Sequence, residues 1–239
     1  MPPGPKLTHE RFHTPTYTGP RSTPLLPSGG HFSILANTTI HAPASTIQSA
    51  ITDIAHYPLW NSHTPKVTLL QTYPPQPADT RMKSGLHMTF HVNEKGFREE
   101  WGNRDGGDVR GLTSSKEVCT SVNARRVCWA FDNAAAVCPP VFFKSERVCE
   151  IEPLGPGQGC RVTTWQSWAG AGARRLKWSQ EKLLQQRFAE WCADLKEWVE
   201  GGGVERIERA RVEAFDREMA EVRKEAEEEE AKDGQLVDA

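Results

Sequence analysis

Alternation of apolar and polar residues predicts a series of short strands in the middle of the chain. Leu86, Met88, Phe90 and Val92 alternate with His and Thr residues, and a period of two places one kind of side chain on each face of a strand. Several such stretches flank short turns, which predicts antiparallel hairpins. The predicted strands cover residues 31–40, 64–72, 86–92, 115–122, 125–133, 145–154 and 160–170.

Helical spacing appears directly after the first strand. Pro43 stands at a favourable first helical position, and Ile47, Ile51 and Ile54 share one face of the run that follows. The pattern ends before Pro58, because the residue before a proline disfavours the helical conformation. A strand, a short helix and a break are therefore predicted in that order.

The longest helix is predicted over residues 174–200. Its large apolar residues recur every three or four positions, as in an amphipathic helix. They are Leu184, Phe188, Trp191, Leu195 and Trp198. Such a wide aromatic stripe must lie on an apolar surface, and the apolar face of the strands is the available partner.

The two ends of the chain differ in composition from this middle part. Residues 1–30 contain seven prolines and few branched apolar residues, which predicts a disordered tail. Residues 201–239 open with three glycines, continue as a charged amphipathic helix and end in an acidic tail. The thin apolar stripe of this helix favours a solvated helix or one lying on the domain, with a protein partner as the alternative.

Overall composition excludes several classes of protein. The chain has 239 residues and a formal net charge of −2, so it lacks the basic field typical of nucleic-acid binding. No run approaches the roughly 18 apolar residues of a membrane span, and the proline-rich start has no apolar signal segment. We therefore expect a cytoplasmic protein with no nucleic-acid partner and no membrane span.

Six cysteines lie nine or more residues apart, without the close spacing of a metal site. Reduced, mostly buried thiols are expected in such a compartment. A disulfide between Cys119 and Cys128 is the alternative, because a hairpin turn at Asn123 places the two cysteines opposite each other. We expect no metal and no cofactor, since a phosphate-binding glycine loop is also missing.

Two segments of the chain resemble a known family. The run "IHAPASTIQSAITDIAHYPLWNSHTPKV" is similar to the opening of the START-like, or SRPBCC, superfamily, which includes polyketide cyclase/dehydrase and coenzyme Q-binding-like proteins. The runs "EIEPLGPGQGCRVTTWQSWAG" and "LLQQRFAEWCADLKEWVE" resemble that superfamily's last hairpin and closing helix. The resemblance covers residues 31–200, although the glycine-rich stretch 94–112 departs from a clear strand pattern.

This resemblance implies an α+β helix-grip fold. A curved, seven-stranded antiparallel sheet would wrap around the long helix, with two short helices after the first strand and an apolar cavity inside. In such a fold Tyr57, Pro58 and Trp60 lie at the open end of the sheet. Trp60 would then border the cavity, with ordinary core packing as the alternative.

Strand parity and the helix stripe together predict the residues that line the cavity. Most of them are apolar, which favours a hydrophobic ligand. The predicted ligand-binding residues are Trp60, Met88, Phe90, Thr120, Trp129, Phe131, Arg147, Cys149, Thr164, Gln166, Trp168, Leu184 and Phe188.

The same parity predicts no catalytic residue, because no His, Asp, Glu or Lys points inward. Gln166 stands where many relatives of the superfamily carry a glutamate, and it cannot transfer a proton at neutral pH. Arg147 would face inward and need an anionic partner, unless it reaches solvent at the start of its strand. Cys149 has no neighbouring His to activate it.

Three functions remain open at this point. A binding or carrier protein for a lipid-like, polyketide-like or quinone-like molecule fits best, because its cavity needs no acid or base. A cyclase or hydrolase acting on a hydrophobic substrate fits the superfamily. An adaptor that uses the charged C-terminal helix is the third reading.

Overall fold

The computed structural model describes residues 19–70, 81–93 and 112–237. The chain forms two compact units, Met1–Glu200 and Gly201–Ala239. Residues 94–112, for which the sequence predicts no clear element, lie almost wholly outside the described residues.

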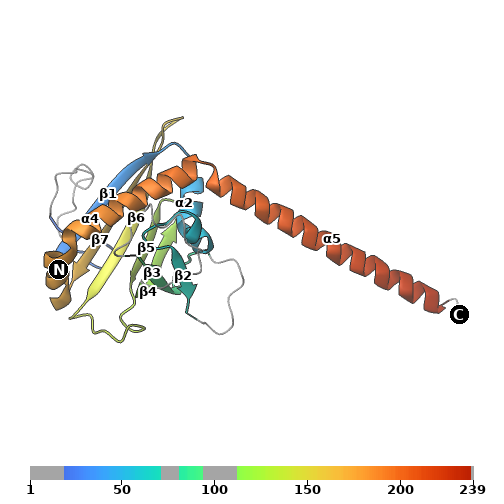
Figure 1. Ribbon diagram of the computed structural model, residues 1–239, viewed down its shortest axis with the longest axis horizontal. Coiled ribbons are helices and arrows are strands. Elements are labelled where there is room, and N and C mark those ends of the chain that lie inside the picture. Colours follow the sequence, from blue (N-terminus) through green and yellow to red (C-terminus); the bar gives the residue numbers. More distant parts are fainter. Residues whose placement is uncertain (1–18, 71–80, 94–111, 238–239) are drawn as a thin grey trace. The chain divides into compact units, whose positions relative to one another are not determined.

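One antiparallel sheet forms the frame of the first unit. It has seven strands in the order β1-β7-β6-β5-β4-β3-β2. Figure 1 shows this sheet curving around one long helix. The strands are β1 (Phe32–Ile40), β2 (Lys66–Leu69), β3 (His87–Val92), β4 (Thr113–Asn123), β5 (Arg126–Phe131), β6 (Lys144–Gly155) and β7 (Gly159–Ala169). The predicted helix-grip fold is confirmed.

Two short helices follow β1, as the sequence predicts. They are α2 (Ala44–Thr52) and the 3₁₀ helix η1 (Ile54–Leu59). The apolar side chains of α2, including Ile47 and Ile51, are fully buried. Pro58 lies inside η1, where the looser hydrogen bonding of a 3₁₀ turn tolerates it.

The long helix α4 (Ala171–Glu200) closes the first unit. Polar side chains tie it to β1 and its following turn: Gln185 donates to the carbonyl oxygen of Leu35, and Lys196 donates to that of Thr39. The carboxylate of Glu200 accepts from the backbone N–H of His41. The helix is therefore held along β1 while its apolar stripe faces the concave side of the sheet.

Aromatic side chains close one end of the concave face. Trp60 packs edge to face on Tyr57 and on Trp191, with ring centroids 5.1 and 5.9 Å apart. The Tyr57 hydroxyl donates to the carbonyl oxygen of Ile51 at 2.6 Å. The aromatic run after α2 therefore seals the core beneath α4, which explains why this connection is not small and polar.

The pairing of β4 with β5 contains a register shift beside Cys119, which determines whether Cys119 and Cys128 lie opposite each other. The register shifts between Cys119 and Ser121, so Cys119 pairs with Trp129 while Cys128 pairs with Ser121. All six cysteines are free. The alternative of a Cys119–Cys128 disulfide is therefore wrong, because the bulge moves the two residues out of register.

Residues 19–30 lie on the convex face of the sheet, against β1, β6 and β7. Arg21 is 1% exposed, and its carbonyl oxygen accepts from the Ser167 hydroxyl at 2.6 Å. The indole N–H of Trp165 donates to the carbonyl oxygen of Ser22. The prediction of disorder is therefore wrong for residues 19–30. Their composition offers few apolar side chains to bury, but their backbone groups form hydrogen bonds with side chains of the sheet, and these bonds hold the segment in place. Residues 1–18 lie outside the described part of the chain.

The second unit consists of the helix α5 (Gly203–Val237). Val212 and Phe215 are 59% and 60% exposed on it, and Met219 is 37% exposed. Among the described residues, no helix is long and apolar enough to cross a membrane.

Candidate functional site

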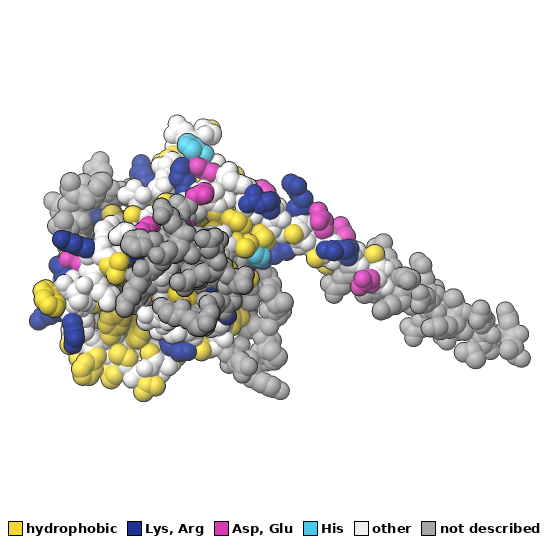
Figure 2. All heavy atoms as spheres, viewed as in Figure 1, with side chains coloured by type: hydrophobic (Ala, Val, Ile, Leu, Met, Phe, Trp, Pro, Cys, Tyr) yellow, Lys and Arg dark blue, Asp and Glu magenta, His cyan; other side chains and the backbone are white. Residues whose placement is uncertain are grey.

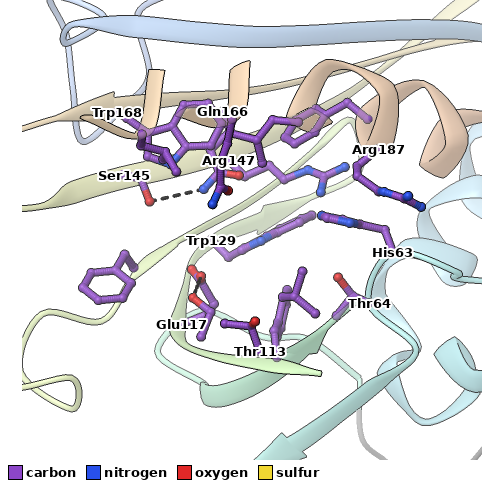
Figure 3. A pocket seen from close by; sticks show the side chains of 18 of the residues that line it. His63, Thr64, Thr113, Glu117, Trp129, Ser145, Arg147, Gln166, Trp168 and Arg187 are labelled. Atoms are coloured by element: carbon purple, nitrogen blue, oxygen red, sulfur yellow. Dashed lines mark hydrogen bonds between the residues drawn. The ribbon is translucent and has the colours of Figure 1, made fainter. Parts of the chain in front are cut away.

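A cavity of about 220 Å³ lies between the concave face of the sheet and α4. Figure 3 shows its labelled side chains converging from the sheet, from α4 and from the loop that carries His63 and Thr64. Its aromatic walls include Phe90, Trp129 and Phe188. An engineered apolar cavity of about 150 Å³ holds benzene, so this cavity has room for a somewhat larger molecule.

Arg147 of β6 lies among these aromatic walls. It is 4% exposed, and its guanidinium carbon is 4.1 Å from the ring centroid of Phe188 and 4.6 Å from that of Trp191. Its Nε donates to the Thr164 hydroxyl at 3.0 Å. Its Nη2, by contrast, has no hydrogen-bond partner among the described residues. A buried guanidinium stays charged and favours an anionic or strongly accepting partner.

Glu117 of β4 also faces the cavity. Its Oε1 accepts from the Ser115 hydroxyl at 2.6 Å, whereas its Oε2 is buried without a partner in the part of the chain that the structure describes. Burial raises the pKa of Glu117 to about 7, against smaller lowering effects of the Ser115 hydrogen bond and of Arg147. The carboxyl group can therefore exchange a proton near neutral pH.

His63 and Arg187 bring two more polar groups to the same walls. Burial and the charges of Arg147 and Arg187 lower the pKa of His63 to about 3, so its ring is neutral at ordinary pH. Arg187 pairs with Glu190 at 2.6 Å. His63 Nδ1 and Arg187 Nε are both buried without a hydrogen-bond partner in the described ranges.

Neutral side chains complete the polar lining. Gln166 of β7 donates from its Nε2 to the Ser145 hydroxyl at 3.2 Å, the contact that Figure 3 marks with a dashed line. Among the described residues, no group of three His, Cys, Asp or Glu side chains is arranged to hold a metal ion. The site therefore combines aromatic walls with two cations, one acid, a neutral imidazole and an amide.

Comparison with known proteins gives a sequence relative and a structural one. "Oxopyrrolidines biosynthesis cluster protein O" of Penicillium oxalicum (strain 114-2 / CGMCC 5302) is 28% identical over 182 residues, which are 70% of this chain and 86% of that protein. Hypothetical protein jhp0584 from Helicobacter pylori aligns at 12% identity with a TM-score of 0.54, over 73% of this chain and 91% of that one. This structural likeness agrees with the helix-grip fold of the domain. No protein-family model matches the chain.

A more remote likeness to this domain is found in norcoclaurine synthase of Thalictrum flavum, solved in complex with dopamine and hydroxybenzaldehyde. It is 11% identical with a TM-score of 0.46, over 70% of this chain and 85% of that one. At this level of similarity the ligands of that enzyme carry no argument about this chain.

Eight of the predicted ligand-binding residues lie in the cavity wall of the helix-grip domain. They come from β3, β5, β6, β7 and α4. They are Phe90, Trp129, Phe131, Arg147, Gln166, Trp168, Leu184 and Phe188. Their role in binding stays a prediction, which the experiments below address.

Five predicted residues lie elsewhere. Met88 and Trp60 are buried in the core, and Cys149 donates from its thiol to Thr164 at 3.2 Å beside Arg147. These four residues lie outside the cavity wall, because other side chains cover them. Thr120 is on the convex face, where its hydroxyl donates to Glu146, so its predicted inward orientation is wrong.

The prediction that no titratable side chain points inward is also wrong. Glu117 pairs with Phe131, a wall residue, and therefore shares its face of the sheet. His63 lies in the loop before β2, where strand parity does not apply. Pairing of β4 with the strongly patterned β5 is the signal that could have placed Glu117.

Proposed function

We propose that the cavity binds a small molecule with an apolar, aromatic-sized body and one anionic or carbonyl-like acceptor group. The acceptor would meet Arg147, and the body would lie between Trp129, Phe90 and Phe188. Hydrophobic ligand binding is the function that the sequence favours most. The buried charged groups favour an amphipathic ligand over a purely apolar one.

The observation that carries this proposal is the set of unpartnered polar atoms around one cavity. Nη2 of Arg147, Oε2 of Glu117, Nδ1 of His63 and Nε of Arg187 are all buried without a hydrogen-bond partner among the described residues. An unmade hydrogen bond in a protein interior costs about 1–3 kcal/mol. Four such atoms on residues that line one cavity favour a ligand that supplies the missing partners.

The sequence relative supports the same class of ligand. The name of that Penicillium protein places it in a biosynthesis cluster for oxopyrrolidines, which are carbonyl compounds. A product or intermediate of secondary metabolism with a polarised carbonyl oxygen would suit the guanidinium of Arg147. The size of the cavity favours a molecule, or an end of one, of about ten non-hydrogen atoms.

Binding of para-toluate and para-xylene by calorimetry or NMR tests the proposal. The two probes share an aromatic body, and only para-toluate carries an anionic group. We expect the wild type to bind para-toluate more tightly, and Arg147→Met to weaken para-toluate binding about tenfold or more, since a hydrogen bond to a charged group contributes about 1.5–3 kcal/mol. Native mass spectrometry of the purified protein would look for a natural ligand.

A matched control is Arg125→Met, which removes an exposed arginine from the β4–β5 turn. It should leave both affinities unchanged. Equal weakening of both probes by Arg147→Met would mean that the guanidinium only supports packing. No binding of either probe by the wild type would contradict a preformed small-molecule site.

An acid–base enzyme is the second candidate, because the pKa of Glu117 lies near neutral pH. In that case the Glu117 carboxylate would remove a proton from carbon next to a carbonyl group, and the C–H electrons would move to the carbonyl oxygen as an enolate. Return of the proton from Glu117 to carbon would balance the reaction. This reading would make the cavity a cyclase-type site, as the superfamily resemblance allows.

Deuterium exchange at the methyl group of acetophenone, followed by NMR in deuterated buffer, separates the two candidates. A base at Glu117 predicts exchange above the buffer rate that Glu117→Gln abolishes, with binding retained. Exchange at the buffer rate while acetophenone binds would leave binding as the function.

A protein partner for α5 stays a prediction, supported by the exposed side chains of Val212, Phe215 and Met219.

A further inference from the structure

Large apolar side chains are exposed at the end of the first unit where α4 begins. Val137, Val141 and Phe142, in the connection between β5 and β6, are 89%, 73% and 60% exposed, and Trp178 in the second turn of α4 is 89% exposed. We name these four residues the apolar rim. Figure 2 shows yellow side chains with dark blue Lys and Arg side chains among them at this end of the domain. Large apolar side chains exposed at one end of a domain are typical of interaction sites.

Backbone hydrogen bonds hold the two parts of the apolar rim together. The backbone N–H groups of Ala171 and Gly172 donate to the carbonyl oxygens of Val141 and Phe142 at 3.0 and 2.8 Å. Gly170 allows this approach, because a Cβ at that position would lie 2.6 Å from the Phe142 oxygen. The rim is thus anchored to the start of α4, so its side chains are exposed in a defined arrangement.

Basic side chains surround Trp178 on the helix. Arg174, Arg175, Lys177 and Lys182 are all exposed, and Arg174, Arg175 and Lys182 lie about one helical turn from Trp178. Glu181 is the acidic side chain within this stretch, and it lies 4.0 Å from Lys177. The surface therefore combines a tryptophan and aliphatic groups with a net positive charge, in a chain whose formal net charge is −2.

We propose that the apolar rim and its cations dock the protein onto an anionic membrane surface. Apolar and aromatic side chains enter the boundary between lipid headgroups and chains, while long basic side chains reach the negative headgroups. Each Lys or Arg near an anionic leaflet strengthens such binding about fivefold. An acidic partner protein would satisfy the cations, but it would leave the protruding Trp178 and Val137 without the soft apolar layer that lipid chains provide.

The apolar rim borders the cavity of the helix-grip domain. Phe143, next to Phe142, and Leu176, Gln180 and Leu183 of α4 all line that cavity. Docking would therefore bring this side of the cavity to the lipid surface. An amphipathic small molecule of the proposed kind, held in the membrane, could then reach the site without crossing water.

Cosedimentation with vesicles tests the docking surface. Vesicles of phosphatidylcholine and phosphatidylserine in equal amounts are compared with vesicles of phosphatidylcholine alone. We expect the full chain to bind the mixed vesicles and to dissociate at high salt, because headgroup attraction is screened. Arg174→Ala with Lys182→Ala should weaken binding about 25-fold, and Trp178→Ala should weaken it about tenfold.

Matched controls are available on other surfaces of the first unit. Lys83→Ala with Arg125→Ala removes two exposed cations outside the apolar rim, and Leu59→Ala removes an apolar side chain that is 58% exposed. Both should leave vesicle binding unchanged. Binding of para-toluate without vesicles should be unaffected by every one of these variants, so that failure of the docking proposal is distinct from failure of the proposed function.

Three results would overturn the proposal. The first is no binding to mixed vesicles, and the second is equal loss of binding in the controls. The third is a wild-type dimer in light scattering that Trp178→Ala converts to a monomer, with no vesicle binding by either, which would make the apolar rim a contact between two copies of the chain.

Discussion

Two buried glutamates lie on opposite faces of the same sheet and differ in their partners. Glu146 of β6 is fully buried on the convex face, where its oxygens accept from the backbone N–H of Leu25 at 2.5 Å and from the Thr120 hydroxyl at 2.6 Å. Glu117 of β4 is 6% exposed on the concave face, and one of its oxygens has no partner within the described residues.

This difference in hydrogen-bond partners indicates a structural role for Glu146 and a functional role for Glu117. Residues 19–30 lie on the convex face, and their backbone groups form hydrogen bonds with the sheet. The buried carboxylate of Glu146 therefore has its hydrogen-bond partners within the fold. The concave face leaves an acid and a guanidinium unpartnered beside a cavity. Buried polar groups of the first kind stabilise a fold, whereas those of the second kind favour a binding or catalytic site.

The largest expected effect comes from the aromatic end of the concave face. Trp191 is 1% exposed and packs on Trp60 beneath the Arg147 guanidinium. Trp191→Ala should lower the free energy of unfolding by about 3–5 kcal/mol in urea titrations. Trp178→Ala, on an 89% exposed position of the same helix, should change it by less than about 0.5 kcal/mol. Similar values for both would show that Trp191 does not support the core.

A smaller loss is expected from the acid on the convex face. Glu146→Ala removes the acceptor of two buried donors, so the free energy of unfolding should fall by about 2–4 kcal/mol. Trypsin should then cleave after Arg21, which is 1% exposed in the folded protein, because the covering segment loses an anchor. Wild-type stability together with resistance at Arg21 would contradict the role of Glu146 in holding residues 19–30.

The free energy of unfolding should depend on pH through the ionisation of Glu117. Its pKa is about 7 in the folded protein against 4.5 for the ordinary group, so the folded state keeps a proton that the unfolded chain releases. Stability from this group is therefore present at low pH and falls as pH rises, by about 2 kcal/mol between about pH 5 and about pH 7. Over the same range the contribution of His63 rises by about as much, so urea titrations should give a wild-type free energy of unfolding that is nearly independent of pH, whereas that of Glu117→Gln should rise with pH.

The control for this profile is His63, which shifts in the opposite direction. Its folded pKa of about 3 lies below the ordinary 6.5, so its contribution is lost as pH falls below about 6.5. His63→Gln should therefore leave a free energy of unfolding that falls by about 2 kcal/mol between about pH 5 and about pH 7, which is the contribution of Glu117 alone. A Glu117→Gln free energy of unfolding that is as independent of pH as that of the wild type would contradict a raised pKa.

The smallest expected effect concerns Gln166, a neutral member of the cavity wall. Gln166→Leu removes the hydrogen bond to Ser145 and one polar group from the site. Affinity for para-toluate should fall by about 0.5–1.5 kcal/mol or less, with para-xylene unchanged or bound more tightly. A loss as large as that of Arg147→Met would mean that the amide, and not the guanidinium, holds the polar group of the ligand.

Sequence patterns alone predict most of the fold and part of the cavity wall. Alternation in residues 86–92 and 160–170 and the stripe of residues 174–200 correspond to β3, β7 and α4. Arg147 and Gln166 could be assigned to one face because their strands have clear apolar phases, and they are register partners in the sheet.

Tertiary structure alone decided the chemistry of the site. The segment Thr113–Asn123 has polar residues in both phases, so its composition does not choose a face, and pairing with β5 turns Glu117 inward and Thr120 outward. Residues 19–30 have too few apolar side chains to predict order, and they are held by backbone groups that meet the sheet across the fold. Local periodicity reports which face of an element is apolar, but only long-range pairing fixes where a weakly patterned strand, a loop or a covering segment places its polar groups.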